Sequence, residues 1–264
     1  MAIDSAKTIV IVTGANRGIG YEIVAALLRA APSGSSRASG APYHVYLGSR
    51  SLDKGQAALA SLKPEYGNSV SLLYLDVTSA DSIAAAVSKV ESETGRVDNL
   101  INNVGIVSTA SDSISRLRET LEVNLVAPYA VTEAFRALLL VQPASGDDKE
   151  KLLIHVTSDL GSIGMRTDPS NKLYNSPFPE YRISKAAINM MAACHQHELL
   201  NSGAKVFAFN PGYAATDLTG DAEARRRRGA RDPKVVGEAC VKIVEGRRDG
   251  DVGLLLDVEG VLPW

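Results

Sequence analysis

The chain has 264 residues, 45% hydrophobic and 22% charged, which is enough for one large α/β domain with a buried core. A formal net charge of −2 gives no overall electrostatic reason to bind nucleic acid or a membrane surface. Because no run approaches the roughly 18 apolar residues of a membrane span, and the apolar run 9–12 is too short for a signal-peptide core, we expect a cytoplasmic protein that binds no membrane.

Short β-branched runs alternate with amphipathic segments along almost the whole chain. The predicted strands cover residues 8–12, 43–47, 70–75, 99–101, 152–156, 206–209 and 253–256. The predicted helices cover residues 19–31, 52–62, 82–93, 117–140, 181–200 and 233–245. Apolar strands that alternate with helices indicate a parallel sheet covered on both faces. We therefore predict a doubly wound Rossmann fold, one α/β domain over residues 1–264 with about seven parallel strands and right-handed crossovers.

Three stretches interrupt this alternation. Residues 31–42 are rich in Ser, Gly and Pro and should form a surface loop, and residues 165–180 form a long irregular segment. Residues 223–231 are locally basic, with four consecutive arginines at 225–228. Because the alternation resumes after each stretch, none is predicted to link two domains. We interpret the arginines first as a solvated helix face; attraction of an anionic substrate, or a localisation signal, stays open.

The turn between the first strand and the first helix carries the sequence TGANRGIG. Such a glycine-rich turn brings backbone N–H groups and a helix N-terminus against a phosphate. Three glycines alone are a weak signal, but this position directly after the first strand is where the motif must lie. The predicted cofactor-binding residues of this turn are Gly14, Asn16, Arg17, Gly18, Ile19 and Gly20.

With this turn, several later features occur in an order that resembles the short-chain dehydrogenase/reductase family: NNVG at 102–105, Asn124, Ser158, Tyr181-x-x-x-Lys185 and PGYAAT at 211–216. The resemblance covers essentially the whole chain. It is most similar to carbonyl-reductase-like members, which share GANRGIG, an SR pair after the second strand and a PGYxxTDL-like run. It implies a nicotinamide-dependent oxidoreductase that interconverts a small-molecule carbonyl compound and its alcohol.

The end of the second strand favours NADP(H) over NAD. A free ribose 2′-hydroxyl is usually held by an Asp or Glu here, but this chain has Gly48 and Ser49, followed by Arg50. A guanidinium can bind a 2′-phosphate with two hydrogen bonds, whereas a carboxylate would repel it. We therefore predict that Ser49 and Arg50 bind NADP(H), with Arg17 as a second phosphate ligand; the alternative for either arginine is a solvated surface charge.

The resemblance also implies further cofactor contacts. Asp76 and Val77 are similar to the pair that meets the adenine ring, and Asn102, Asn103 and Gly105 belong to a run that lines the adenosine ribose in the family. Pro211, Gly212 and Thr216 would close over the nicotinamide. A structural role for the run 102–105 is compatible with this reading.

A tyrosine and a lysine one helical turn apart indicate proton transfer. In isolation Tyr181-x-x-x-Lys185 would be a solvated helix face, but a lysine charge beside a phenol lowers the phenol's pKa toward neutral pH. The resemblance implies that Tyr181 donates a proton to the reduced carbonyl and that Lys185 also bonds the nicotinamide ribose. Ser158, after a strand, would donate to the carbonyl oxygen, unless it only caps a turn.

Asn124 precedes Pro128 by four positions in a helical run. Because proline has no N–H, a helix here frees the main-chain carbonyl of Asn124 and kinks. The resemblance implies that a water bound to this carbonyl passes protons toward Lys185. The alternative is that Pro128 marks a helix start and Asn124 caps it.

Two other functions stay open. The first is an NAD-dependent alcohol or hydroxysteroid dehydrogenase, against which Arg50 argues. The second is a non-catalytic NADP(H)-binding regulatory protein, although such proteins usually lose one of the four residues that are present here, Asn124, Ser158, Tyr181 and Lys185. A Rossmann-like methyltransferase would need no tyrosine–lysine pair.

The sequence predicts no metal site, and its two cysteines, Cys194 and Cys240, suggest free thiols. Residues 160–180 should cover ground near the active site, with Met165 and Tyr213 as candidates for the substrate wall. Because this segment could obstruct association, we expect a dimer or monomer, with a higher homo-oligomer as the alternative.

Overall fold

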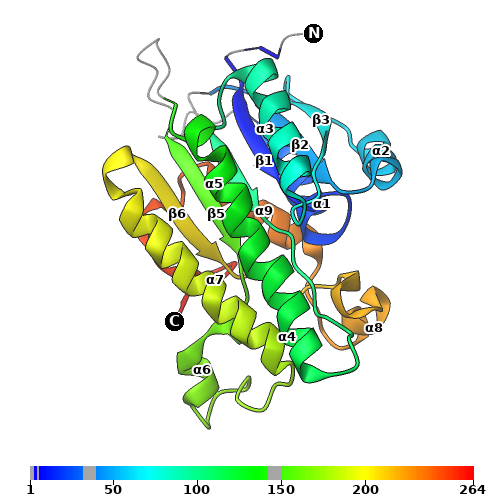
Figure 1. The fold of residues 1–264 in the computed structure, drawn as a ribbon, viewed down its shortest axis with the longest axis vertical. Helices are drawn as coiled ribbons and strands as arrows, with labels where there is room; N and C mark the ends of the chain where they lie inside the picture. Colours follow the sequence, from blue (N-terminus) through cyan, green and yellow to red (C-terminus); the bar gives the residue numbers. More distant parts are fainter. Residues whose placement is uncertain (1–2, 5, 32–39, 142–149) are drawn as a thin grey trace.

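The computed structural model describes residues 3, 4, 6–31, 40–141 and 150–264 (Figure 1). Most of the loop predicted at 31–42 lies outside the described residues. Within them, eight strands form one sheet in the order β3-β2-β1-β4-β5-β6-β7-β8. The strands are β1 (Thr8–Val12), β2 (Tyr43–Ser49), β3 (Ser69–Tyr74), β4 (Asn99–Asn102), β5 (Lys151–Val156), β6 (Ala204–Phe209), β7 (Leu255–Leu256) and β8 (Val261–Leu262).

The doubly wound Rossmann fold is confirmed, since all seven predicted strands occur and β1 to β7 pair in parallel. The eighth strand, β8, was not predicted; it pairs antiparallel with β7 at the edge of the sheet. Its two residues are too few to show the alternation of apolar and polar side chains by which a strand is recognised in a sequence.

Helices cover both faces of the sheet, as Figure 1 shows. One face packs against α1 (Gly18–Arg29), α2 (Leu52–Ser61) and α9 (Pro233–Val244), and the other against α3 (Ala80–Thr94), α5 (Ala127–Leu139) and α7 (Pro179–Glu198). The shorter helices are α4 (Ser113–Leu121), α6 (Ile163–Thr167) and α8 (Ala222–Arg227).

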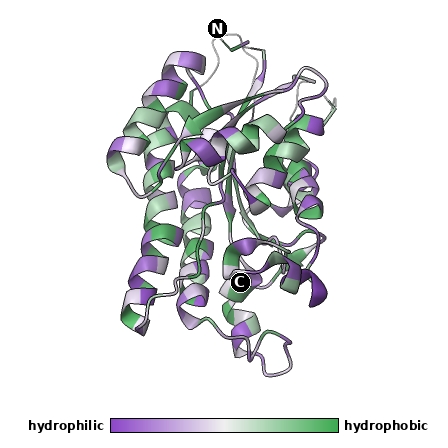
Figure 2. Ribbon diagram, turned by 90° about the vertical axis from the view of Figure 1, so that its right-hand side faces the viewer, coloured by the Kyte–Doolittle hydropathy of each residue, from purple (hydrophilic) through white to green (hydrophobic). Residues whose placement is uncertain are grey.

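The two cores follow from the twofold side-chain alternation of a strand. In β1, Val10 and Val12 face α1 and α9, while Ile9 and Ile11 face α3 and α5, and all four are buried. Figure 2 shows the result, with hydrophobic strands between helices whose outer surfaces are largely hydrophilic. A sheet that is apolar on both faces is therefore fixed in place between two helical layers.

The helix predicted at 117–140 is interrupted, because Glu122–Val126 forms a π-helical turn between α4 and α5. Pro128 has no N–H to donate to the carbonyl of Asn124, so the regular hydrogen-bond ladder cannot continue there. Val126, which precedes α5, keeps helical backbone angles, so the chain does not begin a new helix with Asn124 as its cap. The structure thus favours the interrupted helix over the alternative.

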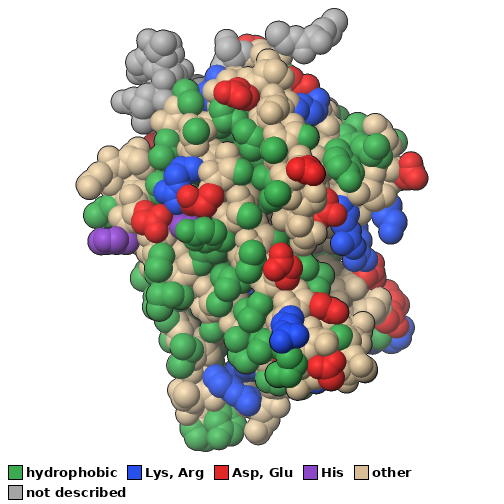
Figure 3. All heavy atoms as spheres, in the orientation of Figure 1, with side chains coloured by type: hydrophobic (Ala, Val, Ile, Leu, Met, Phe, Trp, Pro, Cys, Tyr) green, Lys and Arg blue, Asp and Glu red, His purple; other side chains and the backbone are tan. Residues whose placement is uncertain are grey.

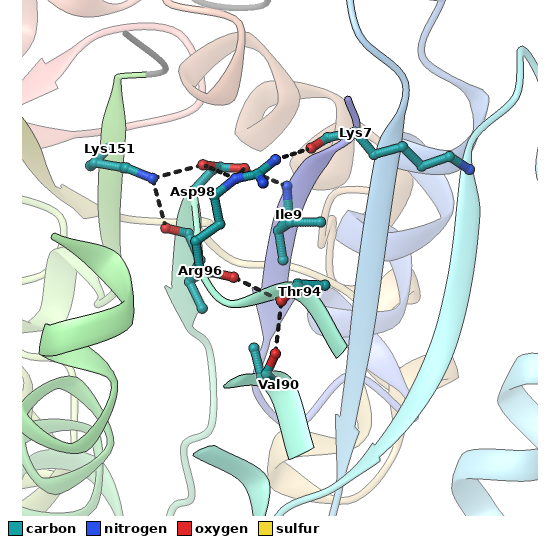
Figure 4. Close-up of polar contacts among 8 residues, drawn as sticks. Lys7, Ile9, Val90, Thr94, Arg96, Asp98 and Lys151 are labelled. Atoms are coloured by element: carbon teal, nitrogen blue, oxygen red, sulfur yellow. Dashed lines mark hydrogen bonds and ion pairs between the residues drawn. The ribbon is translucent and has the colours of Figure 1, made fainter. Parts of the chain in front are cut away.

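A buried ionic cluster ties the amino ends of β1, β4 and β5 together (Figure 4). Lys151 Nζ lies 2.8 Å from Asp98 Oδ1, and the two side chains are 2% and 1% exposed. Asp98 Oδ2 also accepts the backbone N–H of Ile9 at 2.8 Å, and Arg96 Nε lies 3.3 Å from both carboxylate oxygens. Arg96 in turn donates to the carbonyl of Lys7 at 2.8 Å. The cluster therefore fixes the register of three strands at the end of the sheet opposite their carboxyl termini.

The outer surface of α5 and α7 carries several exposed apolar side chains, among them Tyr129, Ile183 and Met190. Figure 3, in the orientation of Figure 1, shows hydrophobic side chains gathered on this face. The oligomeric state stays a prediction.

Among the described residues, none of the helices combines the length and apolar character that crossing a bilayer requires.

Candidate active site

A cavity of about 620 Å³ lies at the carboxyl ends of the central strands. Its walls include Gly14 after β1, Val104 after β4, Ser158 after β5 and Pro211 after β6. The crossovers from β1 and from β4 lead to opposite sides of the sheet, so this is the topological switch point at which doubly wound sheets bind ligands.

The glycine-rich turn lines the cavity at the N-terminus of α1. Gly14 and Gly18 have φ angles of +62° and +59°, a conformation that side chains with a Cβ rarely adopt. The first turn of α1 contains no acidic residue, so its free N–H groups and helix dipole favour an anion. These features fit the phosphates of a dinucleotide.

Gly20, which was predicted to contact the cofactor, is tightly packed in the structure. It does not line the cavity; a Cβ there would lie 2.5 Å from Asn103 Nδ2 and 2.7 Å from the carbonyl oxygen of Gly14. Asn103 Nδ2 donates to the carbonyl of Thr13 at 2.9 Å, so its amide holds the glycine-rich turn against β4. Asn103 itself lines the cavity, as predicted.

Three cationic side chains, Arg17, Arg50 and Lys54, line the cavity near the end of β2. Lys54 was missed in the sequence; it lies in the first turn of α2, shortly after the end of β2, and that place is the signal that could have identified it. Asp76, which also lines the cavity, accepts hydrogen bonds from the hydroxyl and N–H of Thr78, and these bonds lower the pKa of its carboxyl. The charge around this part of the cavity is thus mainly positive.

Two other residues that were predicted to contact the cofactor, Ser49 and Asn102, do not line the cavity. Ser49 is buried, does not line the cavity, and exchanges hydrogen bonds with the backbone of Ser51, so it shapes the turn that presents Arg50. Asn102 points away from the cavity: its Nδ2 donates to Thr132 Oγ1 at 2.9 Å and lies 3.4 Å from His155 Nδ1. Successive residues of a strand face opposite sides, and Asn103, not Asn102, faces the cavity.

Ser158, Tyr181 and Lys185 meet at one end of the cavity. Tyr181 is 9% exposed and Lys185 2% exposed, and Lys185 Nζ lies 5.6 Å from the centre of the Tyr181 ring. Lys185 Nζ donates to the carbonyl of Val156 at 2.9 Å, which fixes the ammonium beneath the end of β5. The arrangement places a hydroxyl and a phenol in the cavity wall, with the lysine amino group beside the phenol ring.

The expected effect of Lys185 on Tyr181 is wrong for this structure. Burial raises the pKa of Tyr181 above its ordinary value and the charge of Asp159 adds to this, while hydrogen bonding to Ser158 and the charge of Arg225 act in the opposite direction. Burial also lowers the pKa of Lys185 to about 7, so its charge is partly lost near neutral pH. Desolvation is therefore the largest influence on the pKa of both groups.

Asn124 supports this site without lining the cavity. Its Oδ1 accepts the N–H of Ile106 at 2.8 Å, and its Nδ2 donates to the carbonyl of Ile106 at 3.0 Å and to Ser184 Oγ at 2.9 Å. The side chain therefore joins the loop after β4 to α7. A Cβ added to Gly105 would lie 3.5 Å from both Asn124 Oδ1 and Lys185 Nζ, so the loop lies directly beside the lysine.

All the remaining residues that were predicted to bind the cofactor line the cavity. They are Asn16, Ile19, Asp76, Val77, Gly105, Pro211, Gly212 and Thr216. Of the two suggested substrate-wall residues, Tyr213 lines the cavity and Met165, in the short helix α6, does not.

A second cavity, of about 540 Å³, adjoins the first at Tyr181. Both are lined by Phe178, which has left-handed backbone angles (φ +70°, ψ +57°) just before α7. Such a conformation is unusual for an aromatic residue and is often found at functional sites. Leu173, Ser176 and Pro177, from the same irregular segment, also line the larger cavity. No grouping of three or more His, Cys, Asp or Glu that could hold a metal occurs in the described parts of the chain, and both cysteines are free.

Asp159 is a further cavity residue that the sequence did not identify, although it directly follows Ser158. Ser158 Oγ donates to Asp159 Oδ1 at 3.0 Å and accepts the N–H of Leu160 at 3.1 Å. Burial raises the pKa of the Asp159 carboxyl, and the Ser158 hydrogen bond lowers it in part. Because a serine hydroxyl has one proton, Ser158 cannot donate to a substrate while it donates to ionised Asp159.

We expect this hydrogen bond to appear in the pH dependence of the reaction. Activity should fall as pH rises through the raised pKa of Asp159, since ionised Asp159 then accepts the hydrogen bond that Ser158 would otherwise donate to the substrate. The Asp159→Asn variant has no carboxyl group to ionise at this position, so its kcat should not fall over this pH range. Asp217→Asn, a change at another carboxyl of the same cavity, should keep it. Superimposable profiles of the wild type and Asp159→Asn would contradict the assignment.

Comparisons with known proteins agree with this geometry. A family model described as short chain dehydrogenase matches residues 8–227. The chain is 34% identical to the short-chain dehydrogenase/reductase eupG of a Phoma species, over 92% of each chain, and 31% identical to tropE of Talaromyces stipitatus, over 97% of each. Among solved structures it is similar to the NADPH-bound carbonyl reductase from chicken fatty liver (TM-score 0.78, 27% identity, 99% of this chain and 100% of that one). It is also similar to the carbonyl reductase Sniffer of D. melanogaster (TM-score 0.77, 25% identity, 98% and 99%).

Proposed function

The chain belongs to the short-chain dehydrogenase family, and on this basis we propose that it is an NADPH-dependent reductase of a small ketone or aldehyde. One observation carries the proposal. The cavity that contains Ser158, Tyr181 and Lys185 at one end contains Arg17, Arg50 and Lys54 at the other, beside the glycine-rich turn. Proton-transfer groups and a phosphate-binding region thus share one space.

The protein's own groups suit the reduction of a carbonyl. The chemistry that NADPH supplies when bound is a hydride for the carbonyl carbon. Ser158 would orient the carbonyl oxygen, and Tyr181 would donate a proton to the alkoxide that develops there. Because burial raises the pKa of Tyr181, its phenol is fully protonated at neutral pH, as a proton donor must be. An alkoxide is a stronger base than a phenolate, so this transfer is still favourable.

Lys185 would maintain the proton supply and hold the dinucleotide. With a pKa near 7, its amine can both release and take up a proton at neutral pH. Asn124, which fixes the loop after β4 against α7, would position Lys185 through Gly105. Arg17, Arg50 and Lys54 would bind the 2′-phosphate, and the N-terminus of α1 the pyrophosphate.

The preference for NADP(H) can be tested at Arg50. Arg50→Asp removes a guanidinium and places a carboxylate near the 2′-phosphate, so kcat/KM with NADPH should fall about 10- to 100-fold or more. The value with NADH should change little or rise. The measurement is the ratio of kcat/KM for the two cofactors with one substrate.

Arg118→Asp provides the matched control, because Arg118 is exposed on α4 and lines neither cavity. It makes the same change in net charge and should leave the cofactor ratio unaltered. A wild type that already favours NADH would instead support the NAD-dependent dehydrogenase that the sequence left open.

The function itself is tested by measuring NADPH oxidation over a panel of aromatic ketones, quinones and aldehydes. At least one class should be reduced by the wild type. NADPH binding without turnover across the panel would overturn the proposal and favour the non-catalytic regulatory protein.

A further inference from the structure

The four arginines at 225–228 divide into two pairs with different surroundings. Arg226 and Arg227 point outward from α8, with side chains 55% and 66% exposed. Arg226 Nη1 lies 3.2 Å from Glu223 Oε2, and Arg227 Nη2 lies 3.9 Å from Asp221 Oδ2. These are surface ion pairs within one short segment. Arg225 and Arg228, three positions apart, instead line the larger cavity.

The guanidinium of Arg225 is held in place by uncharged groups. It lies 4.7 Å above the centre of the Tyr213 ring, and its Nη1 donates to Thr219 Oγ1 at 2.9 Å. Its Nε is buried and has no hydrogen-bond partner within the described residues. The contact with Tyr213 and the bond to Thr219 orient the planar group, and its charge lies in the wall of the cavity that Arg225 lines.

Neither Arg225 nor Arg228 has a carboxylate within ion-pair distance in the part of the chain that the structure describes. Three acids, Asp76, Asp159 and Asp217, line the same cavity, but none of them lies within ion-pair distance of Arg225 or Arg228. A buried donor without a partner is costly, and a guanidinium that lacks an acidic partner can bind a carboxylate through charge-assisted hydrogen bonds. The site is therefore complementary to an anion.

Arg225 lies at the reacting end of the cavity. Its charge contributes to the pKa of Tyr181, opposing the effect of burial. Its neighbour Thr219 lines both the larger cavity and the adjoining one, which meet at Tyr181. The three cationic residues that suit the 2′-phosphate lie on the other side of the topological switch point, near the end of β2. They are Arg17, Arg50 and Lys54.

We propose that Arg225, with Arg228 beside it, forms an anion-binding subsite, and that the carbonyl substrate carries a carboxylate which this subsite binds. The proposal rests on the reductase function proposed above and narrows its substrate class. The same anionic chemistry could come from the cofactor's pyrophosphate, so the experiment separates the two sources.

The test uses two aldehydes of similar size, 4-carboxybenzaldehyde and methyl 4-formylbenzoate, with NADPH. The wild type should favour the acid in kcat/KM by about 10- to 100-fold, the range of a charged hydrogen-bonded pair. Arg225→Gln should lose this preference through a higher KM for the acid. Arg226→Gln, a neighbouring change on the outward side, should retain it. The affinity for NADPH, measured by fluorescence, should be the same in all three proteins.

A binding experiment keeps the test independent of turnover. Calorimetry with the NADP⁺-loaded protein should show that 4-(hydroxymethyl)benzoate binds more tightly than its methyl ester, and only when Arg225 is present. If no member of the carbonyl panel is reduced, these two aldehydes included, but this difference in binding remains, the reductase function fails and the subsite stands. Equal binding or equal kcat/KM for acid and ester in the wild type would overturn the subsite. So would an Arg225→Gln variant with weakened NADPH binding and equal losses for both aldehydes, which would assign Arg225 to the cofactor.

Discussion

Replacing Tyr181 with phenylalanine is expected to lower kcat for carbonyl reduction about a hundred- to ten-thousandfold, the usual contribution of a positioned general acid. The substitution removes only the hydroxyl, and the ring can still pack at the junction of the two cavities. Because the neighbouring Lys185 keeps its bond to the carbonyl of Val156, cofactor affinity should be unchanged. The measurements are single-turnover NADPH oxidation and NADPH binding by fluorescence.

Tyr213→Phe is the matched control. Tyr213 lines the same cavity and is half exposed, and the phenylalanine ring would still support Arg225. This variant should stay within a few-fold of the wild type. A Tyr181→Phe protein as active as Tyr213→Phe would show that some other group supplies the proton.

Replacing Asp98 with alanine is expected to reduce the free energy of unfolding by about 3–5 kcal/mol, because it leaves the charge of buried Lys151 uncompensated. It also removes the acceptor for the Ile9 N–H and thus frees the amino end of β1. The effect should appear as a lower midpoint in urea denaturation. The folded fraction should still bind NADPH normally, since the cluster lies at the opposite end of the sheet from the cavity.

The double variant Asp98→Ala/Lys151→Met distinguishes the unpaired charge from a general packing defect. Removing the lysine charge should recover part of the lost stability, because an apolar pair avoids the desolvation cost of the ions. If Asp98→Ala costs less than about 1 kcal/mol, the pair behaves like a surface salt bridge and the interpretation is wrong.

The fold could be predicted from the sequence because the strands of this sheet are apolar on both faces and are separated by amphipathic helices. Short features, and features that depend on how the surrounding chain packs, could not be predicted. The strand β8 has two residues and no detectable pattern. The π-helical turn at Glu122–Val126 was visible only as a proline in a helical run, which shows where the ladder breaks but not how it is repaired.

The site was predictable where a residue's role follows from its position after a strand, as for Ser158 and Pro211. It was not where the role depends on side-chain direction. Asn102 and Asn103 are adjacent, and only the strand's pleat decides that Asn103 faces the cavity. Ser49 and Gly20 support the turns that carry Arg50 and Gly14, a function that requires knowing their packing partners.

Electrostatic effects were the hardest to foresee. The spacing of Tyr181 and Lys185 suggested a lowered phenol pKa, but burial of both groups has the larger effect. Likewise, a run of four arginines reads as one charged surface. Only the ion pairs of Arg226 and Arg227 with their own helix reveal that Arg225 and Arg228 face another way.

In the proposed reaction, hydride and proton are added to one carbonyl group beside Tyr181. This can be measured with NADPH that carries deuterium at the transferable C4 position, one reduced substrate from the panel, and mass spectrometry of the product. We expect an alcohol with deuterium on its carbinol carbon from the wild type, and almost none from Tyr181→Phe at the same cofactor saturation and reaction time. Equal deuterium transfer by both proteins, or binding of NADPH with no labelled alcohol from any carbonyl compound, would contradict it.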